Sequence, residues 1–312
     1  MKLGIIIPCY NEEEGLAETT HRLHILMNDM ITQKQISSDS FICYIDDGSA
    51  DTTWRIIEET QQSNALFKGL KLSRNFGHQN ALIAGLMQFK DDADGLISMD
   101  ADLQDDIELV REFVAKHTEG YEVIYGVRDD RTSDTSFKRG TAELFYKFQH
   151  FMGIEAVPNH ADYRFLSSRA LNALAEFKEI NLFLRGIVPL LGFRSTSLYY
   201  KRNERFAGET KYPLKKMLYF ALDGIASFSV MPLRIITMVG FMLFLLSLLG
   251  IAWVIFEKIF FGSAVQGWAS TMISIYFIGG IQVISLGIIG EYVGRSFQQG
   301  KNRPRYIVEK EI

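Results

Sequence analysis

Four carboxylates lie within seven residues of the chain, in the segment "MDADLQDD" that directly follows the apolar run "GLIS". Asp100 and Asp102 alternate with Ala101, so both side chains point to the same side of an extended chain. Mg²⁺ and Mn²⁺ prefer oxygen ligands, and Mg²⁺ usually takes one or two carboxylates together with substrate phosphates. The pair therefore indicates either a divalent-cation site or the solvated start of a helix, where Asp105 and Asp106 would suit the positive end of the helix dipole.

A second acidic pair, Asp46 and Asp47, ends the apolar run "FICYID" and is followed by Gly48. These acids either form a polar turn, with Asp51 or Thr52 capping the next helix, or accept hydrogen bonds from a ribose or a base. The sequence contains neither GxGxxG nor GxxxxGK[ST]. Dinucleotide binding and P-loop phosphate binding are therefore not supported.

The elements that must position these acids alternate along the first 200 or so residues. Apolar runs typical of strands are "LGIIIPCY", "FICYID", "FKGLKLS", "GLISMD" and "EVIYGV", and amphipathic helices are expected over 12–30, 51–63, 77–89 and 105–117. Such alternation predicts an α/β fold with a parallel sheet. Ligands of these sheets bind beyond the carboxyl ends of the strands, which is where the polar clusters lie.

Two long uncharged segments follow. Residues 235–256 contain no charge over 22 residues, and residues 262–290 contain none over 29. About 20 apolar residues cross a hydrocarbon core about 30 Å thick, so two transmembrane helices are expected over about 233–256 and 269–290, within 232–290. Residues 213–231 read as an amphipathic helix in the membrane interface, or alternatively as an ordinary packed helix.

Lys and Arg gather before the first uncharged segment and after the second, which predicts cytoplasmic termini. Residues 1–212 would then form a cytoplasmic domain and 291–312 a cytoplasmic tail. Cys9 and Cys43 lie in strand-like runs, and a reducing compartment predicts free buried thiols. The formal net charge is −4, and no basic domain or basic-aromatic interleaving supports nucleic-acid binding.

The ordered motifs together resemble a known family. In chain order they are "IIIPCYNEE", "IDDGSADTT", "RNFGHQNALIAG", "MDADLQDD", "YGVRDDR", "DYRFLSSRAL", "LFLRGIVPLLGF" and "RFAGETKYP". This set resembles the family 2 glycosyltransferases with a GT-A fold, specifically polyprenyl-phosphate glycosyltransferases of the GtrB and dolichol-phosphate mannose synthase type. The resemblance implies a Rossmann-like, mostly parallel catalytic domain followed by an interfacial helix and two transmembrane helices.

The resemblance also implies roles for single residues. Asp102 would hold a Mg²⁺ or Mn²⁺ ion with help from Gln104, and Asp100 would contact the ribose or the water around the metal. The nucleotide would be bound by Pro8, Tyr10, Glu12, Asp46 and Asp47. The phosphates of donor and acceptor would meet Arg128, Arg164, Arg185, Arg202, Arg205 and Lys211. This chain reads "DLQDDI" where the family usually reads "DLQDPP", which changes how the following helix starts.

Asp162 lies where related enzymes keep a base, so the resemblance makes it a catalytic candidate as a base or a positioning residue. The alternative is an acid that pairs with Arg164 or caps the next helix. His78 lies at a strand end and is equally well explained as a turn residue.

The activity implied is transfer of a sugar, with inversion, from a nucleotide diphosphate to undecaprenyl or another polyprenyl phosphate at the bacterial inner membrane. UDP-glucose is the expected donor. The alternatives are a GDP-mannose-dependent polyprenyl-phosphate mannosyltransferase and a non-catalytic, membrane-tethered sugar-nucleotide binding protein. The expected partners are the nucleotide sugar, the lipid phosphate and the membrane, with no nucleic acid. The resemblance also implies a homo-oligomer, a tetramer as in related proteins.

Overall fold

The computed structural model of the chain describes residues 1–129, 160–179, 184–201, 231–261 and 267–312. These residues fall into two compact units. The first contains the described residues up to 201 together with 303–312, and the second contains the two long helices that precede residue 303. The candidate site lies in the first unit.

The first unit is built on an eight-stranded sheet with the order β7-β5-β6-β4-β1-β2-β3-β8. Strands β4, β1, β2 and β3 are parallel, and β5 and β7 are parallel to each other, whereas β6 and β8 are antiparallel to their neighbours. The strands are β1 (Leu3–Cys9), β2 (Phe41–Asp46), β3 (Phe67–Leu72), β4 (Gly95–Ser98), β5 (Val123–Arg128), β6 (His160–Ser167), β7 (Ser195–Tyr200) and β8 (Val308–Glu311). All five strands expected from the sequence are confirmed.

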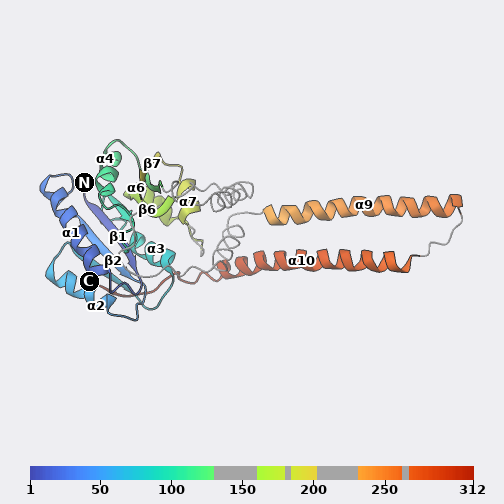
Figure 1. Cartoon of the computed structure of the whole chain (residues 1–312), viewed down its shortest axis with the longest axis horizontal. Helices are drawn as coiled ribbons and strands as arrows, with labels where there is room; N and C mark the ends of the chain where they lie inside the picture. Colours follow the sequence, from blue (N-terminus) through green and yellow to red (C-terminus); the bar gives the residue numbers. More distant parts are fainter. Residues whose placement is uncertain (130–159, 180–183, 202–230, 262–266) are drawn as a thin grey trace. The chain divides into compact units, whose positions relative to one another are not determined.

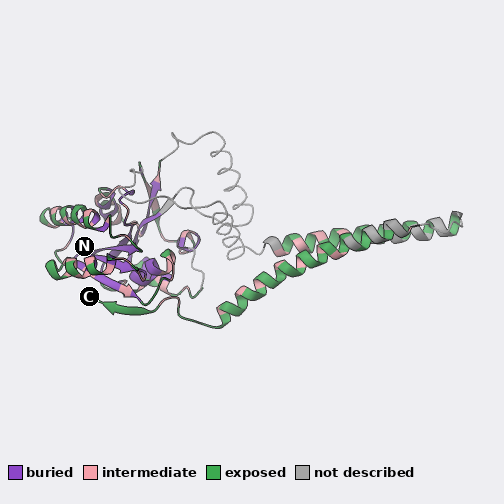
Figure 2. Ribbon diagram, turned by 60° about the horizontal axis from the view of Figure 1, so that its bottom comes forward, coloured by how far each residue is buried: buried purple, intermediate pink, exposed green. Residues whose placement is uncertain are grey.

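Helices cover both faces of this sheet, and Figure 2 shows the buried strands between helices with exposed outer faces. The helices are α1 (Leu16–Thr32), α2 (Thr53–Ser63), α3 (His78–Gln88), α4 (Leu109–Thr118), α6 (Ser168–Ala175) and α7 (Leu184–Leu190). Strand β1 is buried along its whole length because its side chains alternate between two covered faces. Ile5 and Ile7 join one core cluster with residues of α1 and α4, whereas Ile6 faces α3.

Helix α3 lies close to the sheet because Gly85 has no side chain. A Cβ at Gly85 would lie 2.5 Å from Cγ2 of Ile6 and 2.8 Å from Cδ1 of Ile45. These distances are below normal van der Waals contact. The close packing fixes the height of the first turn of α3, which begins at His78, above the sheet.

The last strand, β8, was not expected from the sequence. It pairs antiparallel with β3, and Ile312 exchanges two backbone hydrogen bonds of 2.9 Å with Gly69. Lys71 Nζ also donates to Glu309 Oε1 at 2.9 Å. Figure 1 shows the C-terminal segment lying along the edge of the first unit. The segment that was expected only to form a cytoplasmic tail therefore completes the sheet.

The second unit consists of α9 (Met231–Phe261) and α10 (Trp268–Gly300), which contact each other. Among the described residues, one helical segment, Phe277–Gly300, is long and apolar enough to cross a membrane, and a shorter apolar segment covers Leu233–Leu243. The two expected transmembrane helices are therefore not confirmed. The amphipathic helix expected over 213–231 lies outside the described residues except for its last residue.

Cys9 and Cys43 are both free and buried, as the sequence predicts. Burial raises the pKa of both thiols well above its ordinary value. Neither sulfur is therefore available as a reactive thiolate.

Candidate active site

The polar residues that could bind a ligand or take part in a reaction lie together at the carboxyl ends of the parallel strands. Ser98, the last residue of β4, pairs with Arg164 of β6. Because β6 runs antiparallel to β4, its first residues lie at the edge where β4 ends. Asp162 therefore lies beside Asp100, although the two residues are far apart in sequence. The hydroxyl of Ser98 also donates to the backbone carbonyl of Asp162, which joins the two strands at this edge.

The loop that carries Asp100 and Asp102 has a fixed and strained shape. Leu103 is buried and has a φ of 56°, a left-handed conformation that costs a leucine on the order of 1–3 kcal/mol. The backbone N–H of Gln104 donates to Asp102 Oδ1 at 3.2 Å. On the other side of the loop, Thr19 Oγ1 donates to the carbonyl of Ala101 at 2.7 Å. The strain is held by these surrounding contacts.

Asp100 carries a negative charge that the protein only partly compensates. Its Oδ1 is buried and has no hydrogen-bond partner among the described residues, and the nearest cationic group is Nε2 of His78 at 3.6 Å. Burial raises the pKa of Asp100 to about 6, with the charges of Asp105, Asp162 and Asp102 adding to the effect and His78 opposing it. A cation at this position would remove the cost of that charge.

Asp162 has the opposite environment. Its carboxylate accepts a hydrogen bond from Gln79 Nε2 at 2.9 Å and one from Arg164 Nη2 at 2.5 Å, and Nε of Arg185 lies 3.4 Å away. Burial alone would raise the pKa of Asp162, but the contact with His78 and the charges of Arg164 and Arg185 hold it well below its ordinary value. The carboxylate is therefore ionised at neutral pH.

His78 lies between these two acids. Its Nε2 is 3.5 Å from Asp162 Oδ2 and 3.6 Å from Asp100 Oδ1. Burial would lower the pKa of His78, but Asp162 and Asp100 raise it. His78 therefore belongs to the site, and the sequence left this open. Gln79 was missed altogether, although its position in "RNFGHQN", directly after the third strand, was the available signal.

Asp47 positions this part of α3. Its two carboxylate oxygens accept the backbone N–H groups of Phe76 at 2.7 Å and Gly77 at 2.9 Å. Gly77 has a φ of 92°, which a residue with a side chain rarely adopts. Both oxygens of Asp47 thus hold the turn from which His78 and Gln79 project. The resemblance implied that Asp47 contacts the nucleotide. In the structure, both of its carboxylate oxygens instead accept backbone N–H groups of the loop before α3.

The remaining residues assigned to the nucleotide lie at the carboxyl ends of β1 and β2 or in the loop that follows β1, and the loops after these two strands are hydrogen-bonded to each other. The N–H of Glu12 donates to Thr53 Oγ1 at 2.9 Å, and Asp46 Oδ1 accepts the N–H of Ser49 at 3.2 Å. Asp46 Oδ2 has no hydrogen-bond partner among the described residues, and burial raises the pKa of this carboxyl. Pro8 lies within β1 opposite Ile45. Tyr10 is 47% exposed and is the side chain of this group most open to a ligand.

Arg128, at the end of β5, is held by two other residues. Its Nη2 donates to Asp105 Oδ1 at 3.1 Å and its Nε donates to the Tyr200 hydroxyl at 3.2 Å. The Tyr200 hydroxyl itself donates to Asp105 Oδ1. Asp105 is therefore buried in this cluster and does not start a helix: α4 begins at Leu109. The expectation that Asp105 opens the next helix is wrong, because its carboxylate pairs with Arg128 instead.

Some of the assigned residues are not brought together by the described chain. Arg202, Arg205 and Lys211 lie outside the described residues. Within the described residues, no group of three or more His, Cys, Asp or Glu side chains forms a metal cage. A metal held by Asp102, Asp100 and Gln104 would need further oxygen ligands, which is the usual pattern for Mg²⁺ with a phosphate substrate. The buried Asp100 oxygen, which has no hydrogen-bond partner among the described residues, fits a metal ligand.

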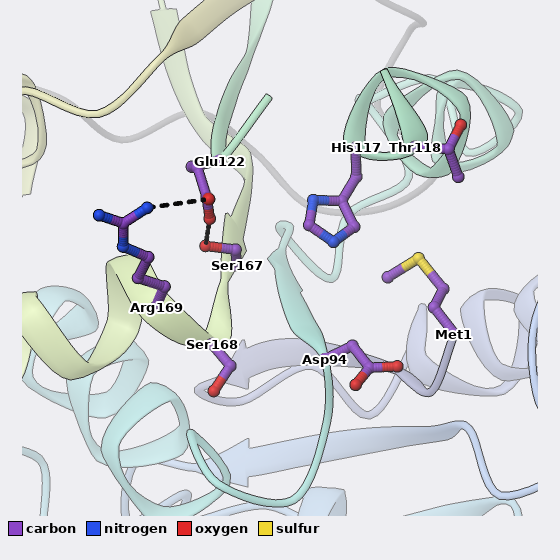
Figure 3. Close-up of a pocket in the computed structure, with 8 residues that line it drawn as sticks. All are labelled: Met1, Asp94, His117, Thr118, Glu122, Ser167, Ser168 and Arg169. Carbon is purple, nitrogen blue, oxygen red and sulfur yellow. Dashed lines mark hydrogen bonds and ion pairs between the residues drawn. The ribbon is translucent and has the colours of Figure 1, made fainter. Parts of the chain in front are cut away.

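A separate pocket lies elsewhere on the first unit (Figure 3). Met1, Asp94 and Glu122 line it, and the Glu122 carboxylate accepts a hydrogen bond from Ser167 and lies 3.7 Å from Arg169. Asp94 and Glu122 precede β4 and β5, whereas Ser167 ends the antiparallel strand β6. The pocket therefore lies at the opposite end of the strands from Asp100 and Asp162, and none of the assigned residues lines it.

A strained acidic loop and an arginine-paired acid lie together at the carboxyl edge of the sheet, which is where ligands of the α/β class of proteins bind. Comparison with known proteins agrees with this class. Residues 4–174 match the model of glycosyl transferase family 2, and residues 231–296 match the GtrB C-terminal hairpin. The chain belongs to the family 2 glycosyltransferases, which confirms the resemblance drawn from its motifs.

Three relatives cover nearly the whole chain. An uncharacterised glycosyltransferase, YkoT of Bacillus subtilis, is 50% identical over 99% of this chain and 92% of its own length. A prophage bactoprenol glucosyl transferase homologue of Escherichia coli is 37% identical over 99% of both chains. The bactoprenol glucosyl transferase of Shigella phage SfII is 37% identical over 99% of this chain and 98% of its own length.

Proposed function

We propose that this protein transfers a sugar, with inversion, from a nucleotide diphosphate to a polyprenyl phosphate at the membrane surface. The observation that carries the proposal is the pairing of two unlike acids at one sheet edge. Asp100 has a buried oxygen without a hydrogen-bond partner among the described residues, so it could meet a cation, whereas Asp162 is surrounded by Arg164, Arg185 and His78. Two relatives named as bactoprenol glucosyl transferases support glucose as the sugar and the polyprenyl lipid as the acceptor.

A divalent metal, Mg²⁺ or Mn²⁺, would be held by Asp102 with Asp100 and Gln104. When bound, such an ion neutralises the diphosphate and stabilises the departing nucleoside diphosphate as a Lewis acid. Asp46, Glu12 and the exposed ring of Tyr10 would hold the nucleotide, with Pro8 shaping the strand end. UDP-glucose is the proposed donor, and GDP-mannose is the alternative.

The acceptor phosphate needs positioning more than deprotonation. The second pKa of a phosphate monoester is about 6, so most of it is a dianion at neutral pH. Asp162 is ionised and tied to two arginines, which makes it a weak base. We therefore assign Asp162 the positioning of Arg185, which is 42% exposed and free to meet a phosphate on its solvent side.

The membrane arrangement completes the proposal. Residues 232–290 would form two transmembrane helices, with residues 1–212 and 291–312 on the cytoplasmic side and 213–231 in the interface. Arg202, Arg205 and Lys211 would bind phosphate near the headgroups, and the protein would form a homo-oligomer. The apolar segment Phe277–Gly300 and the match to the GtrB hairpin support this placement.

The purified protein in vesicles that contain undecaprenyl phosphate tests the proposal. Labelled UDP-glucose, other UDP-sugars and GDP-mannose are supplied with Mg²⁺, with Mn²⁺ or with EDTA, and the labelled lipid is extracted. Glucose-labelled lipid is expected only with UDP-glucose and a metal. Labelling from GDP-mannose alone would support the alternative donor, and no labelling from any sugar would overturn transfer and favour the binding protein.

Asp102→Ala is expected to abolish labelling while the protein still inserts into the vesicles. Asp106→Ala, in the same loop, is the matched control, because the Asp106 carboxylate accepts only the nearby N–H of Glu108, at 3.1 Å, in the described contacts. Full turnover by the Asp102 variant would refute the metal assignment.

A further inference from the structure

Three residues from separate parts of the first unit meet at the sheet edge beside the acidic loop. Asp105 follows β4, and Arg128 and Tyr200 are the paired last residues of β5 and β7. The Asp105 carboxylate is fully buried, the Tyr200 residue is 4% exposed and the Arg128 side chain is 24% exposed. The cluster thus has a closed inner side and one open cationic side.

The inner side depends on this pairing. Asp105 Oδ1 accepts hydrogen bonds from both Arg128 and Tyr200, and Asp105 Oδ2 has no hydrogen-bond partner among the described residues. A buried carboxylate must be paired, because an unpaired charge is costly to keep away from water. Asp105 therefore fixes where the Arg128 guanidinium lies.

Tyr200 fixes the orientation of the same guanidinium. Its hydroxyl accepts a hydrogen bond from Arg128 Nε at 3.2 Å. Both Nε and Nη2 of the guanidinium are therefore held, the second one by Asp105. The Tyr200 ring packs edge-on against Tyr163 at 5.7 Å between centroids, and the Tyr163 hydroxyl donates to the carbonyl of Asp106 at 2.9 Å. The ring is thus anchored in the core and to the same loop.

Within the part of the chain that the structure describes, the contacts with Asp105 and Tyr200 use two of the five N–H groups of Arg128, so three remain for another acceptor. A guanidinium whose N–H groups point in fixed directions binds a phosphate with two hydrogen bonds. Fixing it beforehand avoids the loss of side-chain freedom that binding would otherwise cost.

We propose that Asp105 and Tyr200 are positioning residues that hold Arg128 ready to bind a substrate phosphate. This inference rests on the proposed function only for the identity of that phosphate, which is either the diphosphate of the donor or the monophosphate of the lipid acceptor. The Asp105–Arg128–Tyr200 cluster would then act on substrate affinity and not on the chemical step.

Tyr200→Phe is the main test, because it removes one hydroxyl and keeps the anchored ring. The matched control is Tyr199→Phe, since Tyr199 is the preceding residue and is 69% exposed. The KM for undecaprenyl phosphate is measured at saturating UDP-glucose, and the KM for UDP-glucose at saturating lipid. The Tyr200 variant is expected to raise one KM about 3- to 10-fold and to leave kcat within about twofold.

The substrate whose KM rises identifies the phosphate that Arg128 binds. A higher KM for the lipid assigns Arg128 to the acceptor, and a higher KM for UDP-glucose assigns it to the donor diphosphate; either result supports the positioning role. A fall in kcat with both KM values unchanged, or an effect no larger than that of Tyr199→Phe, would overturn it.

A double-mutant cycle with Arg128→Lys separates positioning from packing. Lysine keeps the positive charge but lacks the planar guanidinium that can donate two parallel hydrogen bonds. Arg128→Lys alone should therefore raise the same KM. If Tyr200 acts through Arg128, adding Tyr200→Phe to Arg128→Lys should raise that KM less than twofold further. Additive effects would show that Tyr200 acts through something other than Arg128, and the inference would fail.

Asp105→Asn extends the test, with Asp106→Asn as its control in the same loop. It should raise the same KM by at least as much as Tyr200→Phe. If the Asp105 variant does not fold, the Tyr200 results alone decide. If the wild-type protein transfers no sugar, the proposed function fails, and binding of UDP and of vesicles with undecaprenyl phosphate is compared for wild type, Tyr200→Phe and Tyr199→Phe. Equal binding of both ligands by all three proteins would then overturn the inference.

Discussion

Asp100 and Asp162 lie at the same sheet edge and are joined through one histidine, yet their charges are treated in opposite ways. Two arginines and a glutamine surround Asp162, whereas Asp100 has a buried oxygen without a hydrogen-bond partner among the described residues. The pKa of Asp162 is held well below its ordinary value, and that of Asp100 is raised to about 6.

The difference separates two kinds of acidic residue in an active site. The charge of Asp162 is compensated when the chain folds, so this residue belongs to the framework of the site. The charge of Asp100 is only partly compensated in the folded chain, by His78, so a cation or ligand bound there would remove an electrostatic cost.

The largest change in the free energy of unfolding is expected when the Asp162 carboxylate is removed. Asp162→Ala leaves Arg164, which is 1% exposed, without its carboxylate partner. Removing one member of a buried ion pair typically destabilises a protein by about 3–5 kcal/mol. Urea unfolding of the purified protein, followed by circular dichroism, measures the loss.

The control for that variant is Glu59→Ala, which removes an exposed ion pair with Arg55. It should change the free energy of unfolding by less than about 1 kcal/mol. Similar losses for the two variants would mean that the Asp162 pairs do not support the fold.

The next largest change in stability is expected when a nucleotide and a divalent cation are added. UDP with Mn²⁺ should stabilise the wild-type protein by about 2.7 kcal/mol at a ligand concentration of 100 times Kd, since a ligand that binds only the folded state shifts the equilibrium by this amount. The gain should be smaller with UDP and EDTA, and Asp102→Ala should lose the metal-dependent part. Thermal unfolding with each ligand set checks this, and an equal gain with and without the metal would contradict the cation assignment.

A smaller effect, of opposite sign to that of Asp162→Ala, is expected from Asp100→Asn in EDTA. A carboxyl whose pKa is raised in the folded state makes the protein less stable as the pH rises from about 4 through about 6. Removing that carboxyl should therefore stabilise the protein at pH 7 by about 1 kcal/mol, because one third of the side chain meets solvent and part of the charge is screened.

The pH dependence of the same variant distinguishes the two acids. The advantage of Asp100→Asn over wild type should shrink as the pH falls through about 6 and vanish below about pH 4, where Asp100 is protonated in both states. The contribution of Asp162 has the opposite sign, since a depressed pKa gives stability that is present above about pH 4 and is lost at lower pH. Denaturant unfolding at pH 4, 5, 6 and 7 measures the contribution of Asp100, and unfolding of wild type and Asp162→Ala below pH 4 measures that of Asp162. An Asp100→Asn protein less stable than wild type at pH 7 would contradict the comparison.

The sequence predicted the uncompensated side of this site better than the compensated side. Asp100 and Asp102 follow a buried strand with a spacing of two, so local pattern alone located them. The strands β1 to β5 were equally visible, because strands buried on both faces are nearly continuous apolar runs.

The sequence offered the pair of Asp162 with Arg164 as one alternative, but the other contacts of the compensated side are ones that no local pattern records. Gln79 meets Asp162 across 83 residues, and Tyr200 meets Asp105 across 95 residues. Both contacts exist because strands distant in the chain are neighbours in the sheet. Strand β8 was missed for a related reason: its residues "VEKE" are exposed and carry no apolar pattern, and only the edge of β3 makes them a strand.

The smallest effect is expected from His78, which joins the two acids. His78→Gln removes a side chain that is 44% exposed, so the loss of stability should be below about 1 kcal/mol. Its pKa is raised in the folded state, so its contribution is fully present below about pH 6.5 and is lost as the pH rises through the folded value. Denaturant unfolding at pH 6 and pH 9 should therefore show a difference from wild type only at pH 6, with His21→Gln unchanged at both. A difference of the same size at pH 9 would mean that His78 holds the site by packing and not by its charge between Asp100 and Asp162.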